Sequence, residues 1–286
     1  MSLATLAEVL QPALRDGYAV AGLVTLGWED MRAYVEAAEL EGCPVILQAG
    51  PACRANTPLP ILGKMFQHLA SEASVPVVAH LDHGYTYEEC REALDCGFTS
   101  LMFDGSRMPL DRNIEETAAI VALAHTAGMS CEGEIGFVGY TGKEMSRGTE
   151  PQEAARFAME TGVDAMAISV GNLHLQQNPA EADLDEARIR SIEALTGVPL
   201  VIHGGSGVPL AQRARLARTS NICKFNIGTE LRIAFGTALR QAVNGDAERF
   251  DRIAILNDTH EPLVAATRRV LRQLKATDQV SPEHSR

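Results

Sequence analysis

Short runs of apolar, often β-branched residues alternate along the chain with longer segments in which apolar residues recur at helical spacing. Runs that are apolar at nearly every position are typical of strands buried on both faces of a parallel sheet. The pattern predicts eight such strands, at residues 18–23, 45–48, 75–81, 100–103, 130–135, 165–170, 199–203 and 222–227. It predicts helices at residues 29–40, 61–72, 87–96, 113–127, 151–161, 185–196, 210–219, 229–244 and 260–275, and a helical pattern also runs through residues 1–17.

Eight strand–helix units favour a closed architecture over an open sheet. Eight parallel strands, each followed by a helix, close into a (β/α)₈ barrel. An open sheet that binds a dinucleotide usually carries a G-x-G-x-x-G turn after its first strand, where this chain reads AGLVTLGWED. No linker or low-complexity segment divides the chain. The sequence therefore predicts an α/β protein with a single (β/α)₈ TIM-barrel domain at residues 1–275 and a disordered polar tail at residues 276–286.

Composition narrows the classes of function. The net charge of −12 argues against a nucleic-acid partner, which would require a basic stripe. Only 5% of residues are aromatic, which argues against a surface that stacks on bases. The six cysteines form no C-x-x-C pair, the first residues do not resemble a secretory leader, and no apolar run is long enough to cross a membrane. We therefore expect a soluble, cytoplasmic protein with reduced thiols and no membrane partner.

Polar residues stand at the ends of otherwise apolar strands, where the active sites of (β/α)₈ barrels lie. The third strand ends in HLDHG, the fifth carries CEGEIG, and the seventh ends in HGGSG. Across strands three to eight, the candidates for chemistry are His80, Asp82, His83, Asp104, Glu132, Glu134, Asn172, His174, His203, Lys224, Asn226 and Thr229.

Three of these candidates, His83, His174 and His203, each stand at or just past a strand end and are expected to meet at one rim. A single histidine in such a place is more often an ordinary hydrogen-bonded residue. Three histidines beside the carboxylate of Asp82 instead favour a metal site, because three imidazoles with an open fourth position are typical of catalytic zinc. Co²⁺ and Mn²⁺ stay open as alternatives, although three histidines favour Zn²⁺.

A glycine-rich segment, Gly204, Gly205, Ser206 and Gly207, follows the seventh strand. Thr229 stands at the expected N-cap of the helix after the eighth strand. Backbone N–H groups and hydroxyls in these two places can bind an anion, and the loops after strands seven and eight of barrels commonly bind phosphate. The alternative is a flexible turn followed by an ordinary helix cap. The position in the barrel favours a phosphate site.

In this order, the motifs HLDHG, DGS, E-x-E-I-G, a histidine after the sixth strand, HGGSG and K-x-N-x-x-T resemble the class II ketose-bisphosphate aldolases, which include fructose- and tagatose-bisphosphate aldolases. The resemblance implies one Zn²⁺ per subunit on His83, His174 and His203. It places Glu134 and Asp104 near an alternative or second metal position, with a monovalent cation as a further alternative there. It also implies a homodimer or homotetramer.

By the same resemblance, the protein is a lyase that cleaves a phosphorylated ketose to dihydroxyacetone phosphate and an aldehyde. The enediolate left by this cleavage would be stabilised by Zn²⁺ acting as a Lewis acid. Asp82 would exchange a proton with the hydroxyl beside the bond that breaks, and Glu144 would be the second carboxylate that handles protons. The residues implied in binding dihydroxyacetone phosphate are Gly204, Gly205, Ser206, Gly207, Asn226 and Thr229.

The chain departs from the family pattern at several positions that contact substrate. The family usually has asparagines after the first strand and a serine after the second, where this chain has LVTLG at 23–27 and QAGP at 48–51. After the histidine that follows the sixth strand, the family has a glycine and then a lysine, where this chain has LQQN at 175–178. Gly228 replaces an aspartate, and the loop FVGYTGKEMSRGTE lacks the usual paired acids. The metal ligands and the base are kept, whereas many of the residues that contact substrate differ. We therefore expect a substrate other than fructose 1,6-bisphosphate, and a phosphate contact that is weakened by the loss of the lysine.

Two other functions stay open. A metal-dependent isomerase, epimerase or decarboxylase of a related sugar phosphate or keto acid would use the same charge stabilisation on the same barrel. A non-catalytic homologue that binds a phosphorylated ligand as a sensor or scaffold is the second alternative. The intact Asp82 argues against the latter, because a binding protein has no use for a general base.

Overall fold

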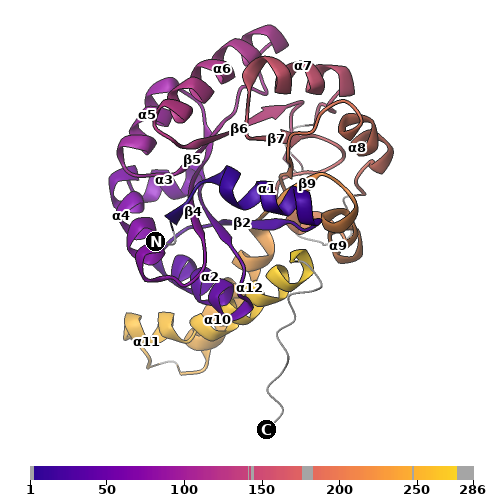
Figure 1. The fold of residues 1–286 in the computed structure, drawn as a ribbon. Coiled ribbons are helices and arrows are strands. Elements are labelled where there is room, and N and C mark those ends of the chain that lie inside the picture. The colour runs from indigo at the N-terminus through magenta and orange to yellow at the C-terminus, as the bar shows by residue number, and fades with distance from the viewer. Residues whose placement is uncertain (1–2, 141, 143–144, 176–182, 247, 276–286) are drawn as a thin grey trace.

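The structure is a computed structural model that describes residues 3–140, 142, 145–175, 183–246 and 248–275 (Figure 1). Its eight central strands pair in parallel in chain order, and the last pairs again with the first, so the sheet closes on itself. This is a single (β/α)₈ TIM barrel, as the sequence predicts. The strands of the ring are β2 (Val20–Val24), β3 (Val45–Ala49), β4 (Val77–Gly84), β5 (Ser100–Phe103), β6 (Ser130–Ile135), β7 (Ala165–Ile168), β8 (Leu200–Ile202) and β9 (Ile222–Ile227).

Most of the helices form an outer ring around these strands (Figure 1). Their apolar faces pack against the outward-facing aliphatic residues of the barrel in one continuous cluster. α12 packs against α2, and α11 projects from the body of the barrel. The helices are α1 (Leu6–Asp16), α2 (Trp28–Glu41), α3 (Pro51–Asn56), α4 (Leu59–Glu72), α5 (Tyr87–Asp95), α6 (Leu110–Thr126), α7 (Pro151–Thr161), α8 (Glu186–Glu193), α9 (Leu210–Thr219), α10 (Thr229–Asn244), α11 (Arg252–Asn257) and α12 (His260–Leu274).

The N-terminal helix α1 lies across the middle of the ring of strands and closes its N-terminal end (Figure 1). Thr5 and Glu8 form a capping box at the start of α1, and Gly17 ends it in a left-handed conformation. The apolar face of α1 packs on inward-facing strand residues, among them Val20, Ile46, Val78, Ala165, Ala167, Val201 and Cys223. We call this end the floor of the barrel and the opposite, C-terminal end its mouth.

The strands predicted at 100–103, 130–135 and 222–227 have those bounds in the structure. β4 continues to Gly84, past the predicted end at residue 81, and the two-residue strand β1 (Leu3–Ala4), α3 and α11 were not predicted. The predicted tail at 276–286 lies outside the described residues. None of the described helices is long and apolar enough to cross a membrane. All six cysteines are free thiols.

Candidate active site

Three histidines meet at the mouth of the barrel. His83 lies near the end of β4, His174 follows β7, and His203 follows β8. One ring nitrogen from each lies within 4.8 Å of the others, and the ring centroids are 4.8–5.6 Å apart. His83 and His203 are buried, and His174 is partly buried. The closed ring of parallel strands therefore brings together three side chains that are far apart in the sequence.

The end of β4 presents two consecutive residues, Asp82 and His83, to the same pocket. In a regular strand, neighbouring side chains point to opposite faces. Here the pairing of β4 with β5 shifts register between Leu81 and Gly84, and His83 adopts a left-handed backbone conformation with a φ of 55°. A β-bulge of this kind re-aims a side chain. As a result, Asp82 Oδ1 lies 3.9 Å from His83 Nε2.

The orientation of the His83 ring is set by Asp104, which follows β5. His83 Nδ1 donates to Asp104 Oδ2 over 2.8 Å, and Asp104 Oδ1 accepts from both the amide and the hydroxyl of Ser106. Burial disfavours a charged His83, but Asp82 and Asp104 outweigh burial and raise the pKa of His83 to about 9. Because Nδ1 is hydrogen-bonded to Asp104, Nε2 is the nitrogen that stays available to bind a metal.

The ring of His203 is oriented by a layer of fully buried charged residues, Glu132 and Lys224, inside the barrel. Its Nε2 donates to Glu132 Oε1 over 3.0 Å, and Lys224 Nζ donates to Glu132 Oε2 over 2.6 Å. His80 lies beside Lys224, and burial together with this ammonium lowers the pKa of His80 to about 3. Ser100 Oγ lies 2.8 Å from His80 Nδ1. The hydrogen bond to Glu132 leaves Nδ1 of His203 to face the mouth.

Several buried polar atoms at this site have no hydrogen-bond partner among the described residues, among them Asp82 Oδ1, Glu134 Oε2 and His203 Nδ1. Glu134 Oε2 lies 4.0 Å from His83 Nδ1 and 3.9 Å from His203 Nδ1. Burial and the nearby Asp104 raise the pKa of Glu134 to about 7. Imidazole nitrogens and carboxylate oxygens are the ligands that Zn²⁺ takes in proteins, and buried polar atoms without partners are unfavourable unless something binds them. The donor set therefore fits a zinc ion.

His83 and His174 line a pocket of about 270 Å³ between the ends of β2, β3, β4 and β9 and the loops that follow β6, β7 and β8. His203 lies against His83 without lining this pocket. Asp82 lies on its wall. Gly204, Ser206, Asn226 and Thr229 line the same pocket. This places predicted metal ligands, predicted base and part of the predicted phosphate site around one cavity.

The glycine-rich segment after β8 is held against the start of α10. Gly204 has a φ of 66°, and a Cβ at this position would lie 2.0 Å from the carbonyl oxygen of Leu173, so only glycine fits. Ser206 Oγ accepts from the amides of Gly228 and Glu230. The N-cap of α10 is Gly228, so the expectation that Thr229 is the N-cap was wrong by one residue. Thr229 is instead the first helical residue.

Comparison with known proteins agrees with this geometry. Residues 4–279 match the family model of class II fructose-bisphosphate aldolases. The chain is 36% identical to a fructose-bisphosphate aldolase of Geobacillus stearothermophilus, over 93% of this chain and 94% of the relative. It is 34% identical to the Staphylococcus epidermidis enzyme of the same name, over 96% and 97%. The chain belongs to the class II fructose-bisphosphate aldolase family.

Among solved structures, this aldolase is similar to the YdjI aldolase from Escherichia coli K12. The TM-score is 0.82 and the sequence identity 28%, with 98% of this chain and 100% of the other covered. The likeness extends over the complete barrel, and both chains are aldolases.

Not every predicted site residue lies at the pocket of this aldolase. Gly205 and Gly207 are buried in a short 3₁₀ turn (Gly205–Gly207) and do not line the cavity. A Cβ on Gly205 would lie 3.0 Å from the carbonyl oxygen of Asn226, which gives this glycine a packing role. Glu144, the predicted second proton-handling carboxylate, lies outside the described residues.

The sequence reasoning missed two residues that line the pocket, Arg232 and Tyr140. Arg232 lies in α10 one turn after Thr229, and its buried Nε has no hydrogen-bond partner among the described residues. The helical spacing from Thr229 is a signal that could have found it. Tyr140 comes from the loop after β6 and stacks on His174, with ring centroids 4.7 Å apart. Nothing in the sequence pattern of that loop indicates this contact.

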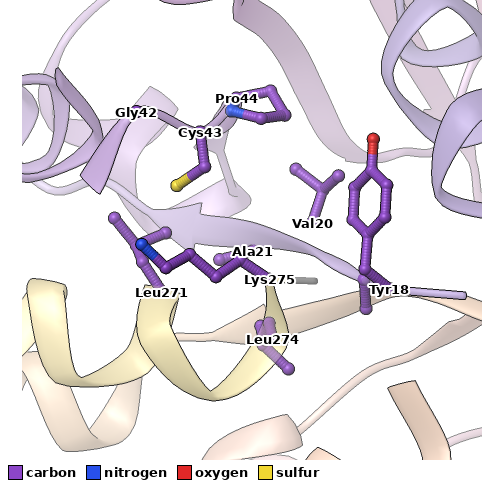
Figure 2. Close-up of a pocket in the computed structure, with 10 residues that line it drawn as sticks. Tyr18, Val20, Ala21, Gly42, Cys43, Pro44, Leu271, Leu274 and Lys275 are labelled. Atoms are coloured by element: carbon purple, nitrogen blue, oxygen red, sulfur yellow. The ribbon is translucent and has the colours of Figure 1, made fainter. Parts of the chain in front are cut away.

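A second pocket lies at the floor, between the start of β2, the start of β3 and the end of α12 (Figure 2). Its volume is about 70 Å³, and Cys43 and Lys275 lie there among apolar side chains. Burial raises the pKa of the Cys43 thiol to about 11, so the nucleophilic thiolate is scarce at neutral pH. The pocket at the mouth, with its larger volume and its polar groups, is the candidate active site.

Proposed function

We propose that this aldolase uses a metal ion, Zn²⁺ by ligand type, to cleave a phosphorylated ketose into dihydroxyacetone phosphate and an aldehyde. We also propose that its preferred ketose is not fructose 1,6-bisphosphate. The observation that carries the proposal is the cluster of His83, His174 and His203. Two of these histidines, His83 and His174, line the same pocket as Gly204 and as Asp82, whose Oδ1 has no partner among the described residues.

The three histidines would hold the ion, with Glu134 and Asp104 beside them. When bound, Zn²⁺ supplies Lewis-acid stabilisation of the negative charge that develops next to the ketone carbonyl, which is worth several kcal/mol in reactions of this kind. Asp104 acts by fixing the ring of His83, and Glu134 offers its unpartnered Oε2 for an alternative or second cation position. Both carboxylates can therefore act from the positions that they have in the structure.

Asp82 would accept the proton of the hydroxyl beside the bond that breaks. Burial disfavours its ionised form, but the neighbouring His83 and His203 outweigh burial and lower its pKa. Asp82 is therefore ionised at neutral pH. Its Oδ1, which has no partner among the described residues, is available to take a proton.

The phosphate of the substrate would lie between Gly204, Ser206 and the first turn of α10. The start of a helix attracts anions because its first N–H groups point outward and the helix dipole is positive there. Arg232 adds a cationic side chain to the same pocket. The lysine that the family pattern has after His174 is absent from this chain, and Arg232 would supply a positive charge in its stead. The phosphate contact would then be weakened less than the sequence pattern indicates.

The proposal that the substrate differs from fructose 1,6-bisphosphate is supported by where the unusual residues lie. Leu26, Pro51, Leu175 and Gly228 all belong to segments that depart from the family pattern, and all four line the pocket. Apolar or small side chains thus occupy segments in which the family pattern has asparagines, a serine and an aspartate, and Leu175 adds an apolar side chain where the pattern has a glycine. Such a wall favours a substrate with fewer charges than a bisphosphate.

The experiment pairs metal content with substrate choice. Purified enzyme is assayed for metal by mass spectrometry, and activity is compared before chelation, after chelation and after Zn²⁺ is added back. A panel of ketose 1-phosphates and ketose bisphosphates is then tested with coupled detection of dihydroxyacetone phosphate. We expect metal-dependent release of dihydroxyacetone phosphate. A clear preference for fructose 1,6-bisphosphate would contradict the substrate proposal, and products without dihydroxyacetone phosphate would contradict aldol cleavage.

A further inference from the structure

The short helix α3 places a buried arginine behind the metal site. The side chain of Arg54 is 8% exposed, and its guanidinium donates to three backbone carbonyls. Nη1 donates to Ala49 O over 2.6 Å and to Asp82 O over 2.7 Å, and Nη2 donates to His83 O over 2.9 Å. Arg54 thus contacts the backbone of the predicted base and of the first predicted zinc ligand.

These carbonyls lie where the regular pairing of the sheet ends. The pairing of β3 with β4 ends where Ala49 lies opposite Leu81. The pairing of β4 with β5 shifts register between Leu81 and Gly84. The carbonyls of the bulged residues therefore need donors from elsewhere. The planar guanidinium, with five donors in a fixed geometry, can serve several acceptors at once.

A carboxylate completes the arrangement. Glu89, in the first turn of α5, accepts from Arg54 Nε over 3.0 Å, and its other oxygen accepts from the amide of Tyr85 over 2.9 Å. Arg54 and Glu89 therefore tie the backbone on both sides of His83. This is the histidine whose left-handed conformation a non-glycine residue rarely adopts.

We propose that Arg54, supported by Glu89, is a positioning residue that holds the Asp82–His83 backbone in the bulge that turns both side chains toward the metal. Without the guanidinium, His83 relaxes toward extended backbone, and its ring moves away from His174 and His203. Arg54 lies outside the metal ligands and acts through the backbone alone. The inference rests on the proposed metal site and names a residue that the metal site itself does not contain.

The test measures metal binding directly. Arg54→Met keeps the aliphatic stem and removes the donors, and Arg54→Lys restores one cation with fewer donors. Zn²⁺ affinity is measured by competition with a chromophoric chelator, and Co²⁺ is added to read ligand geometry from its absorption spectrum. We expect Arg54→Met to weaken Zn²⁺ binding by about 10–100-fold and to change the Co²⁺ spectrum. Arg54→Lys should recover part of the affinity, and kcat should fall more than KM changes.

The matched control is Arg268→Ala, which removes an arginine that hydrogen-bonds to Glu41 far from the site. It should leave Zn²⁺ affinity and the Co²⁺ spectrum unchanged. If Arg54→Met does not fold, Glu89→Gln and Arg54→Lys take its place, each with a smaller expected loss of affinity. Wild-type affinity and spectrum in these variants would overturn the inference about Arg54. Failure of the wild-type enzyme to bind Zn²⁺ would instead overturn the proposed metal site.

Discussion

The floor and the mouth of the barrel are built from the same strands but differ in the groups that they bury. The floor buries apolar side chains, whereas the mouth buries polar atoms that have no hydrogen-bond partner among the described residues. At the floor, the apolar face of α1 packs on inward-facing aliphatic residues such as Val20 and Ile46. At the mouth, several buried polar atoms, among them Asp82 Oδ1 and Glu134 Oε2, have no partner among the described residues, and His83 has a left-handed backbone conformation. The floor stabilises the fold, and the mouth keeps groups available for a ligand.

One strand shows how the change is made. In β4, Val78 packs at the floor, His80 lies in the buried charged layer, and Asp82 reaches the pocket. These residues are two apart and share the inner face of the barrel. Val78 is apolar and needs no hydrogen-bond partner, and His80 has partners within the barrel. Asp82 has an oxygen, Oδ1, without a partner among the described residues. In this strand, the distance from the mouth therefore decides whether a polar side chain is structural or available to a ligand.

The largest effect is expected at the mouth. Asp82→Ala should lower kcat by roughly 10²–10⁴-fold, because no other described carboxylate lines the pocket. Zn²⁺ should stay bound, since the three histidines are unchanged. Kinetics on the preferred ketose phosphate and metal content by mass spectrometry check this. Retained turnover would show that Asp82 is not the base, and loss of zinc would show that it serves the metal.

A change in the layer of buried charged residues beneath His203 should lower both the stability of the protein and its affinity for Zn²⁺. Glu132→Gln leaves the ammonium of Lys224 buried without a counter-charge, so the free energy of unfolding should fall by about 3–5 kcal/mol. Zn²⁺ affinity should fall by about 10–100-fold, because His203 loses a charged acceptor. Denaturant titration and metal competition measure the two effects. Adding Lys224→Met should restore stability without restoring affinity; recovery of both would mean that Glu132 does not orient His203.

A change at the floor should separate stability from function. Leu10 is fully buried in α1, and Leu10→Ala should lower the free energy of unfolding by about 2–5 kcal/mol through the cavity it leaves. Zn²⁺ affinity and kcat of the folded fraction should match the wild type. Urea unfolding and metal competition at low temperature test this. A loss of metal affinity would mean that the two ends are not independent.

The smallest effect is expected in the pH dependence of stability. Burial favours protonation of Glu41, but hydrogen bonds from Arg272, Arg268 and Lys275 outweigh it and lower its pKa to about 2. Because the folded pKa is depressed, this carboxylate stabilises the protein above its ordinary pKa of 4.5 and loses that contribution as the pH falls toward 2. Glu41→Gln should lower stability at pH 7 by about 1 kcal/mol, since the partners are partly exposed.

Unfolding of the wild type and Glu41→Gln, measured from pH 7 down to pH 3, should show the difference shrinking as the pH falls below about 4.5. A constant difference over that range would mean that Glu41 does not titrate with a depressed pKa. Zn²⁺ affinity at neutral pH serves as the control and should not change.

The barrel and the histidine cluster could be predicted because both follow from periodicity. Buried parallel strands read as short apolar runs, and their C-terminal ends share one rim, so His83, His174 and His203 could be placed together without coordinates. The role of Arg54 could not be predicted. It lies in a six-residue helix that starts at Pro51, too short to show a period, and its partners are backbone carbonyls that any sequence would carry.

Which residues of the glycine-rich segment line the pocket could be predicted only in part, for a related reason. Gly204, Gly205 and Gly207 are alike in the sequence, but Gly204 lines the pocket while the other two are packed in a turn. Which glycine faces a ligand depends on the conformation of each residue. Arg232 was missed because its unpartnered Nε is a property of its surroundings.

The closed barrel, the order of its strands and the kinds of residue at its mouth could all be predicted from the chain, since these depend on local pattern and on the parallel geometry of the sheet. Tertiary structure alone decided which polar atoms are satisfied and which are left for a ligand. Asp82, His83 and Glu134 differ from structural polar residues only through their neighbours. Hydrogen-bond partners come from distant segments, and no local pattern in the chain records them.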